Sequence, residues 1–226
     1  MNIEAVILDF GGTLASGEMD WYEYHSAIRL LLTGLGYEVE NARLDKAIRS
    51  SLQELRRVRS RGKEMTLEEV YGSALERQGL IPDGETLREI HGIFKQHYRS
   101  VFYPCTERVL EELHRKYKLA MISNTFSDQP RELLEERGLD ELFEVMICSR
   151  DLGVRKPNPE IFRYTLDTLG MEAKQAVHVG DSVEADMEGA AGVGITPIWI
   201  RTQGEKPWSG RAISSICELP SYLERM

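Results

Sequence analysis

The stretch that decides the fold is EAVILDFGGTL, residues 4–14. Its first part, from Glu4 to Asp9, is apolar almost throughout and partly β-branched, as expected for a buried strand of a parallel sheet. Asp9 ends this run, and the glycines that follow, Gly11 and Gly12, let a ligand approach the backbone and let backbone amides face an anion. The stretch therefore predicts a strand that delivers a carboxylate and an anion-binding loop to one edge of a sheet.

Four more short apolar runs predict strands of the same kind. They are Leu119 to Ser123, Val145 to Cys148, Ala176 to Gly180 and Thr196 to Ile200. The segments between the later strands have helical periodicity, and Pro130 and Pro159 occupy positions suited to the first turn of a helix. Alternating strands and helices predict an α/β fold, a Rossmann-like parallel sheet with right-handed crossovers.

The long segment between Leu14 and Leu119 contains no run that resembles a strong strand, and it predicts helices instead. The expected helices are Trp21 to Leu35, Ala42 to Arg59, Thr66 to Gln78 and Glu85 to Arg99. So much helix is too long for one crossover and indicates a separate subdomain. We therefore expect a discontinuous core domain, residues 1–15 and 102–226, and an inserted α-helical domain, residues 16–101.

Composition limits the class of protein. The chain has 226 residues, of which 42% are hydrophobic, and a formal net charge of −9. An acidic protein is a poor general binder of nucleic acid, because affinity for the phosphate backbone depends on basic residues. No apolar run approaches the ~18 residues that a membrane span needs, and the start of the chain, with Glu4, lacks the basic leader of a signal peptide. We expect a soluble protein, monomeric or homodimeric, without nucleic-acid or membrane partners.

Three cysteines, Cys105, Cys148 and Cys217, lie far apart in the sequence. Zinc sites and disulfide frameworks favour closer or even spacing. The spacing therefore predicts three reduced, mostly buried thiols and a cytoplasmic location.

The predicted strands bring polar side chains to one edge of the sheet, because ligands bind beyond the carboxyl ends of parallel strands. These side chains are Asp9 after the first strand, Ser123 and Asn124 at the second, Lys156 after the third, and Asp181 after the fourth with Asp186 one helical turn onward. A carboxylate can attack phosphorus and form an aspartyl-phosphate. Carboxylate oxygens are ligands that Mg²⁺ prefers, and Lys156 could neutralise charge on a transferring phosphoryl group. The set indicates phosphoryl transfer.

The order of these motifs, DxxGT, a strand-end Ser-Asn, Lys-Pro-x-Pro and GDSxxxD, resembles the haloacid dehalogenase superfamily over the whole chain. The resemblance implies a sheet with strand order 5-4-1-2-3 and a helical cap of the C1 type. It implies that Asp9 is the nucleophile and that Ser123 and Lys156 orient the phosphoryl group, with Gly12 and Asn124 beside the substrate. Mg²⁺ is expected on Asp9, the Gly11 carbonyl and Asp181, supported by Asp186.

Gly11 departs from the pattern of the family's phosphatases, which usually carry an Asp two residues after the nucleophile. That Asp protonates the leaving group and then activates water, and such acid–base help is worth about 10²–10⁴-fold in rate. Water or a residue of the inserted domain (Glu18, Asp20, Glu23 or His25) could replace it, or the substrate could have a good leaving group. The expected function is a Mg²⁺-dependent phosphatase of a small phosphorylated metabolite. The alternatives are a 2-haloacid dehalogenase, a phosphonatase, and a weakly active module that binds a phosphorylated ligand.

His178 is the only histidine within a predicted strand. The pattern favours a core histidine whose polar atoms are satisfied. The alternative is a hydrogen-bond partner for Asp181.

Overall fold

The computed structural model describes residues 2–202 and 208–226. The chain divides into two compact units: the segment up to Ser16 together with Val101–Met226, and Gly17–Ser100. We call them the core unit and the helical unit and describe each by itself.

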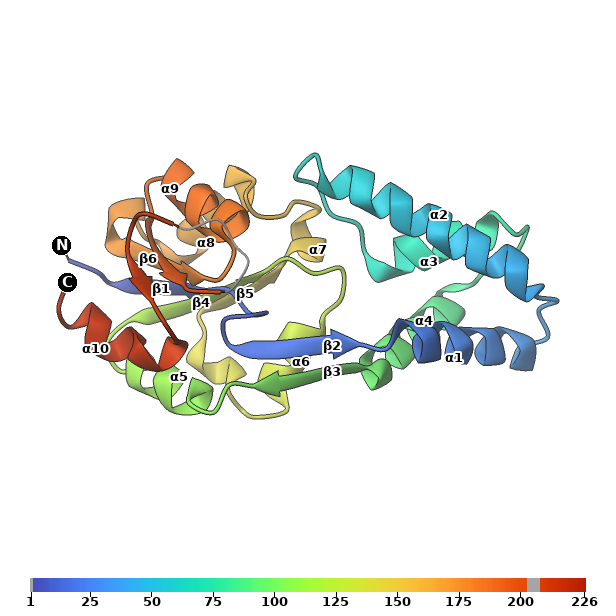
Figure 1. Ribbon diagram of the computed structural model, residues 1–226, viewed down its shortest axis with the longest axis horizontal. Coiled ribbons are helices and arrows are strands. Elements are labelled where there is room, and N and C mark those ends of the chain that lie inside the picture. Colours follow the sequence, from blue (N-terminus) through green and yellow to red (C-terminus); the bar gives the residue numbers. More distant parts are fainter. Residues whose placement is uncertain (1, 203–207) are drawn as a thin grey trace. The chain divides into compact units, whose positions relative to one another are not determined.

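A six-stranded parallel sheet forms the centre of the core unit (Figure 1). Its order is β5-β4-β1-β6-β7-β8, and all the neighbours pair in parallel. The strands are β1 (Ala5–Leu8), β4 (Lys118–Ser123), β5 (Val145–Cys148), β6 (Ala176–Gly180), β7 (Thr196–Ile200) and β8 (Ala212–Ile213). The first five confirm the predicted strands and their order. The short edge strand β8 was not predicted, because two residues carry no periodic signal.

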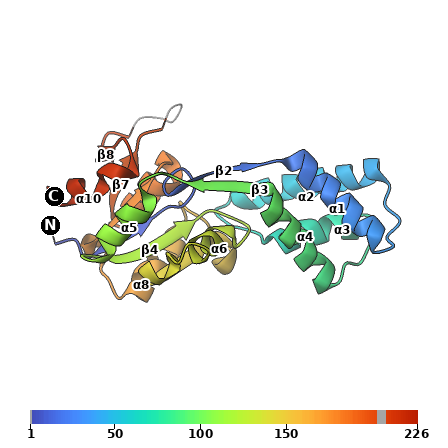
Figure 2. The same ribbon diagram turned by 90° about the horizontal axis from the view of Figure 1, so that it is seen from below.

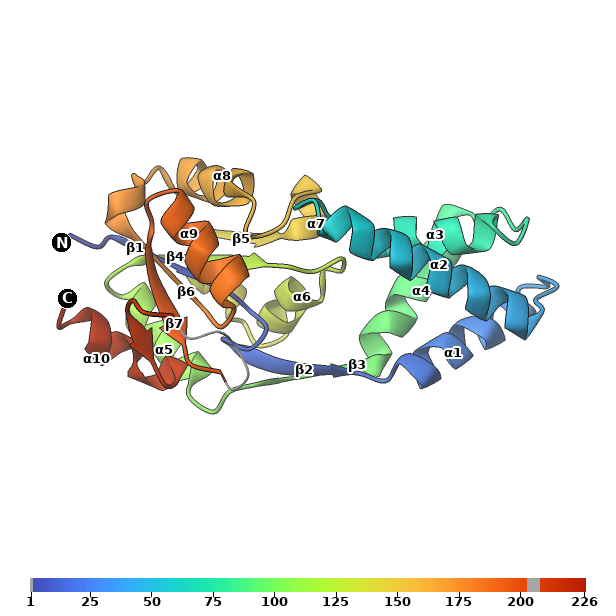
Figure 3. The ribbon, with the colours of Figure 1, turned by 45° about the horizontal axis from the view of Figure 1, so that its top comes forward.

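Helices cover both faces of this sheet, as the uniformly apolar strands require. Val6 and Leu8 of β1 pack into one hydrophobic cluster with α5 and α10, whereas Ala5 and Ile7 pack into the other with α8 and α9 (Figures 2 and 3). The helices of the core unit are α5 (Thr106–His114), α6 (Gln129–Glu135), α7 (Ser149–Leu152), α8 (Pro159–Leu169), α9 (Gly189–Gly192) and α10 (Leu219–Leu223). Short 3₁₀ turns form η1 (Asp140–Leu142), η2 (Ala173–Gln175) and η4 (Ile216–Glu218), and η3 (Val183–Glu188) is a wide turn of π-helix. The first strand is thus buried on both sides, and Asp9 follows it directly.

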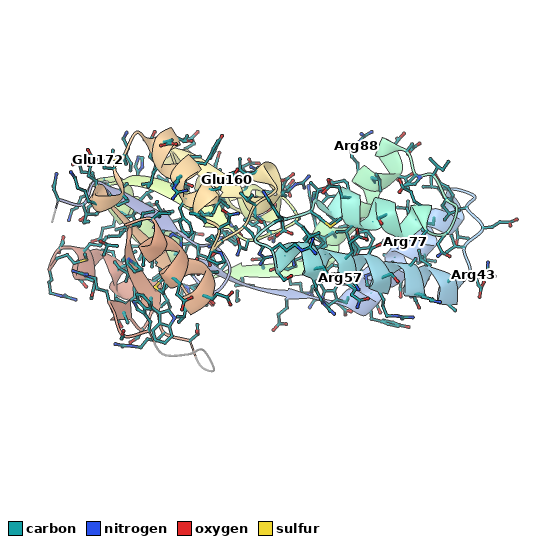
Figure 4. All side chains as sticks on the ribbon, turned by 90° about the horizontal axis from the view of Figure 1, so that it is seen from above. Arg43, Arg57, Arg77, Arg88, Glu160 and Glu172 are labelled. Carbon is teal, nitrogen blue, oxygen red and sulfur yellow. A yellow bond between two sulfur atoms is a disulfide. The ribbon has the colours of Figure 1, made fainter. Side chains whose placement is uncertain are left out.

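The helical unit contains the four helices that the periodicity predicted. They are α1 (Trp21–Gly34), α2 (Asn41–Arg59), α3 (Leu67–Glu76) and α4 (Gly84–His97). Tyr24 is fully buried, and its ring meets those of Tyr71 and Phe94 edge-on, with centroids 5.4 and 5.5 Å apart. Charged side chains such as Arg57 of α2 and Arg77, directly after α3, are exposed (Figure 4). This unit therefore has a hydrophobic core of its own.

Two strands lie where none was predicted. β2 (Ala15–Met19) and β3 (Tyr98–Phe102) form a separate two-stranded sheet at the two points where the chain leaves and re-enters the core unit. β2 has the sequence ASGEM, which has little β propensity. Pairing with β3 outweighs this low propensity. The expectation that the segment between Leu14 and Leu119 contains no strand was therefore wrong.

The expectation of three free cysteines was also wrong. Cys105, before α5, forms a disulfide with Cys217 of η4, and the Cα atoms are 5.6 Å apart. Only Cys148 is free among the cysteines; burial raises the pKa of its thiol to about 12. Because two of the cysteines form a disulfide, cysteine usage no longer supports a cytoplasmic location, which stays a prediction.

Among the described residues, no helix combines the length and the apolar character of a bilayer-spanning segment.

The disulfide closes a loop between residues 112 positions apart, so it restricts the unfolded chain strongly. We expect Cys217→Ser to lower the free energy of unfolding by about 2–4 kcal/mol, measured by chemical denaturation. A reductant should destabilise the original chain and leave the Cys217→Ser variant unchanged. Equal stability of both chains under oxidising conditions would show that the bridge contributes nothing.

Candidate active site

Three neighbouring strands end at the candidate site. β1 lies between β4 and β6 in the sheet, so Asp9 after β1, Ser123 at the end of β4 and Asp181 after β6 share one edge. The Asp9 N–H donates to the Val179 carbonyl at 2.9 Å, which continues the strand pairing up to the carboxylate. The predicted convergence of these side chains follows from the parallel topology.

The Asp9 carboxylate is buried and has two protein donors. Lys156 Nζ lies 2.6 Å from Oδ1, and the Thr13 hydroxyl donates to Oδ2 at 3.2 Å. Burial raises the pKa of Asp9 to about 7, against the opposing effect of the Lys156 ammonium. A further cation beside Asp9 would favour its charged form.

Lys156 is 2% exposed, and its ammonium has three acceptors. These are Asp9 Oδ1 and Asp186 Oδ1, both at 2.6 Å, and the Ile122 carbonyl at 2.8 Å. Burial opposes the charge, but the two carboxylates raise the pKa of Lys156 above its ordinary value. The ammonium is therefore paired with the carboxylates of Asp9 and Asp186, and its contact with a phosphoryl group stays a prediction.

Asn124 holds the backbone of Lys156. Its Oδ1 accepts from the Lys156 N–H at 2.8 Å, and its Nδ2 donates to the Lys156 carbonyl at 2.9 Å. Asn124 was predicted to lie beside the substrate. The structure gives its amide this supporting contact, which ties the end of β4 to the segment after β5.

Asp186 lies in η3 and is 1% exposed. Its Oδ1 accepts from Lys156 and lies 2.8 Å from His178 Nε2, and its Oδ2 accepts from the Ser182 N–H at 3.1 Å. Burial disfavours its charge, but Lys156 and His178 hold the pKa of Asp186 below its ordinary value. The suggestion that His178 pairs with Asp181 was wrong, since its partner is Asp186.

The loop after Asp9 brings the backbone close to Asp181. Gly12 has a φ of +79°, in the left-handed region, and a Cβ at this position would overlap the Asp181 carboxylate. A glycine is therefore required there. At Gly11, by contrast, a Cβ would meet nothing within 4 Å, so the missing side chain has room.

Three carboxylates gather at this edge. One oxygen each of Asp9, Asp181 and Asp186 lie within 4.8 Å of one another. They oppose the single ammonium of Lys156, so the cluster carries an excess of negative charge that a divalent cation would cancel. All the donors are hard oxygens, the type that Mg²⁺ prefers, and the residues present therefore fit a Mg²⁺ site.

The Ser123 side chain completes the edge. Its residue is 6% exposed, and in the described part of the chain its hydroxyl has no hydrogen-bond partner. Contact of this hydroxyl with a phosphoryl oxygen stays a prediction.

Sequence reasoning missed three contributions. Thr13 donates to Asp9, His178 contacts Asp186, and Trp199 Nε1 donates to the Asp181 carbonyl at 2.8 Å. The role of Thr13 could have been predicted, because it is the threonine of the DxxGT motif. Trp199 had none, because its role depends on β7 lying beside β6.

Two of the four residues suggested as a substitute acid, Asp20 and His25, make local contacts in the helical unit. Asp20 caps α1 by accepting from the Glu23 N–H at 3.1 Å. His25 Nε2 lies 3.0 Å from the Tyr71 hydroxyl, and burial lowers the pKa of His25. That one of these residues replaces the missing acid stays a prediction.

Known proteins are similar to this chain in sequence and in fold. Phosphoserine phosphatase of Thermus thermophilus is 34% identical over 135 residues, 59% of this chain and 53% of that protein. The chain spans about half the length of the curated relatives it matches.

Two solved structures share the fold over nearly the whole length. A 2-haloacid dehalogenase from Pseudomonas syringae has a TM-score of 0.73 at 24% identity, with 99% of both chains covered. A HAD phosphatase from Thermococcus onnurineus has a TM-score of 0.65 at 27% identity, with 98% of both chains covered.

The family model of haloacid dehalogenase-like hydrolases matches residues 3–194, which include every residue predicted for the candidate site. With the strand order and the arrangement of Asp9, Lys156 and Asp181 described above, the chain belongs to the haloacid dehalogenase-like hydrolases.

Proposed function

We propose that the protein is a Mg²⁺-dependent phosphatase that hydrolyses a phosphate monoester of a small metabolite through an aspartyl-phosphate on Asp9. The observation that carries the proposal is the position of the Asp9 carboxylate, held by Lys156 and Thr13 beside a second carboxylate, Asp181. Similarity to a phosphoserine phosphatase supports the reaction type.

Each residue of the site has a separate role in the proposed reaction. The Asp9 carboxylate attacks phosphorus, the P–O bond to the leaving group breaks, and water then attacks the acyl phosphate, which releases phosphate and restores the carboxylate. Lys156 offsets negative charge next to the reacting oxygens, and the Ser123 hydroxyl donates to one of them. Asp9, Asp181 and the Gly11 carbonyl would hold Mg²⁺, which supplies charge neutralisation on the phosphoryl oxygens when bound.

Two alternatives differ in what they require. A 2-haloacid dehalogenase would release halide without added metal, and a binding module would be stabilised by a phosphate ligand without turnover. The excess of carboxylates over ammonium groups favours a metal-dependent reaction, and halide and phosphate release separate the three functions.

Asp9→Asn should reduce phosphate release from p-nitrophenyl phosphate by at least about 10⁴-fold, because the amide is a poor nucleophile. Activity of the original chain should vanish with EDTA and return with Mg²⁺. Full activity of the Asn variant would contradict the role of Asp9 as the nucleophile. Phosphate release in the presence of EDTA would contradict the requirement for Mg²⁺.

Gly11→Asp should raise turnover of an unactivated sugar phosphate by about 10²-fold, since the new carboxyl can protonate the alkoxide and has space. Acetyl phosphate, whose leaving group departs without a proton, should gain little. Gly11→Asn is the control of equal size. If neither substrate gains, another residue or water already performs the proton transfer.

Asn124→Ala should lower turnover and destabilise the fold by about 1–3 kcal/mol, because the Lys156 N–H loses its acceptor in a buried place. Asn158→Ala is a matched control. Asn158 caps α8 two residues after Lys156 by accepting from the Glu160 N–H, so its loss should cost a similar ~1 kcal/mol with turnover unchanged. Equal losses of turnover in both variants would mean that stability alone explains the effect.

A further inference from the structure

His178 occupies a position where an apolar residue would be expected. It lies at the centre of β6 between Ile7 of β1 and Pro197 of β7, and it is 0% exposed. The other residues of β6 are alanine, valine and glycine. An imidazole in such surroundings costs free energy unless its polar atoms are paired.

Only one of its two nitrogens is paired. Nε2 lies 2.8 Å from Asp186 Oδ1, whereas Nδ1 is buried without a hydrogen-bond partner in the part of the chain that the structure describes. The ring of Phe162 meets the imidazole edge-on, with centroids 5.2 Å apart. A carboxylate only accepts, so we assign the proton to Nε2. The polar contribution of His178 is therefore this one donor.

That donor acts on a chain of contacts that ends at Asp9. Asp186 Oδ1, which accepts from His178, also accepts from Lys156 Nζ at 2.6 Å, and the same Nζ lies 2.6 Å from Asp9. The Ser182 N–H holds the other oxygen of Asp186. His178 and Ser182 together determine how the Asp186 carboxylate is turned toward the ammonium.

We propose that His178 is a positioning residue: its Nε2–H fixes the Asp186 carboxylate so that the Lys156 ammonium stays on Asp9. Its effect on turnover rests on the proposed phosphatase function, whereas its effect on Lys156 does not. A histidine that merely filled the core would instead act through stability.

Three variants separate the two roles. The amide nitrogen of Gln takes the place of Nε2, the amide nitrogen of Asn takes the place of Nδ1, and Leu supplies no donor. His178→Asn and His178→Leu should lower kcat by about 10- to 100-fold, as for other groups that orient a reacting centre through a neighbour, with KM changed less than about threefold. His178→Gln should keep kcat within about threefold of the original chain. The melting temperature of the Leu variant should change little, because the loss of the hydrogen bond to Asp186 is offset by the removal of the unpaired Nδ1.

A second readout does not need turnover. Reductive methylation with formaldehyde and cyanoborohydride, followed by peptide mass spectrometry, measures how accessible the Lys156 amine is. Lys156 should be methylated at least about fivefold faster in the Leu and Asn variants than in the original chain, and at an unchanged rate in the Gln variant. Lys174, which is exposed and paired with Glu172, is the internal control.

The outcomes are distinct. Absence of phosphate release from the original chain would refute the proposed function, and the methylation rates would still decide the role of His178. Equal methylation of Lys156 in all four proteins would overturn the inference. So would full kcat in the Leu variant, or losses of kcat in all three variants that follow their melting temperatures.

Discussion

One ammonium group among buried carboxylates is the interaction on which the site depends. Lys156 Nζ joins Asp9 and Asp186, residues separated from it by 147 and 30 positions in the sequence. Removing this ammonium would leave the two buried carboxylates uncompensated, which is strongly destabilising. The strands β1, β4 and β6 therefore have to end at the same place, since the Ile122 carbonyl of β4 is the third acceptor.

Close packing around this ammonium explains two glycines. A Cβ at Gly12 would overlap the Asp181 carboxylate, and a Cβ at Gly180 would overlap that of Asp186. The carboxylates can approach one another only because the neighbouring backbone carries no side chain at these two positions. The same approach concentrates negative charge, so the geometry that forms the site also produces the excess of charge that a cation would offset.

The parts of the structure that could be predicted are those with a local or topological signal. Buried strands have apolar runs, and parallel strands place Asp9, Ser123 and Asp181 on one edge. The rest depends on distances that only the folded chain defines. Cys105 and Cys217 are 112 residues apart, and the contact of Asn124 with the Lys156 backbone needs the segment after β5 to return to the end of β4. His178 was recognised as buried, but its partner depends on how η3 turns Asp186 back toward β6.

The residue at position 11 also affects the charge of the site. A carboxylate there would be a fourth negative group beside one ammonium, whereas the three present leave an excess that one divalent cation balances. Since a Cβ at Gly11 would meet no atom within 4 Å, packing does not exclude a side chain. With glycine at this position, the excess of negative charge around Asp9 is smaller than it would be with a carboxylate, and burial already raises the pKa of Asp9 to about 7. An additional carboxylate would raise this pKa further, so Asp9 stays ionised more readily without one.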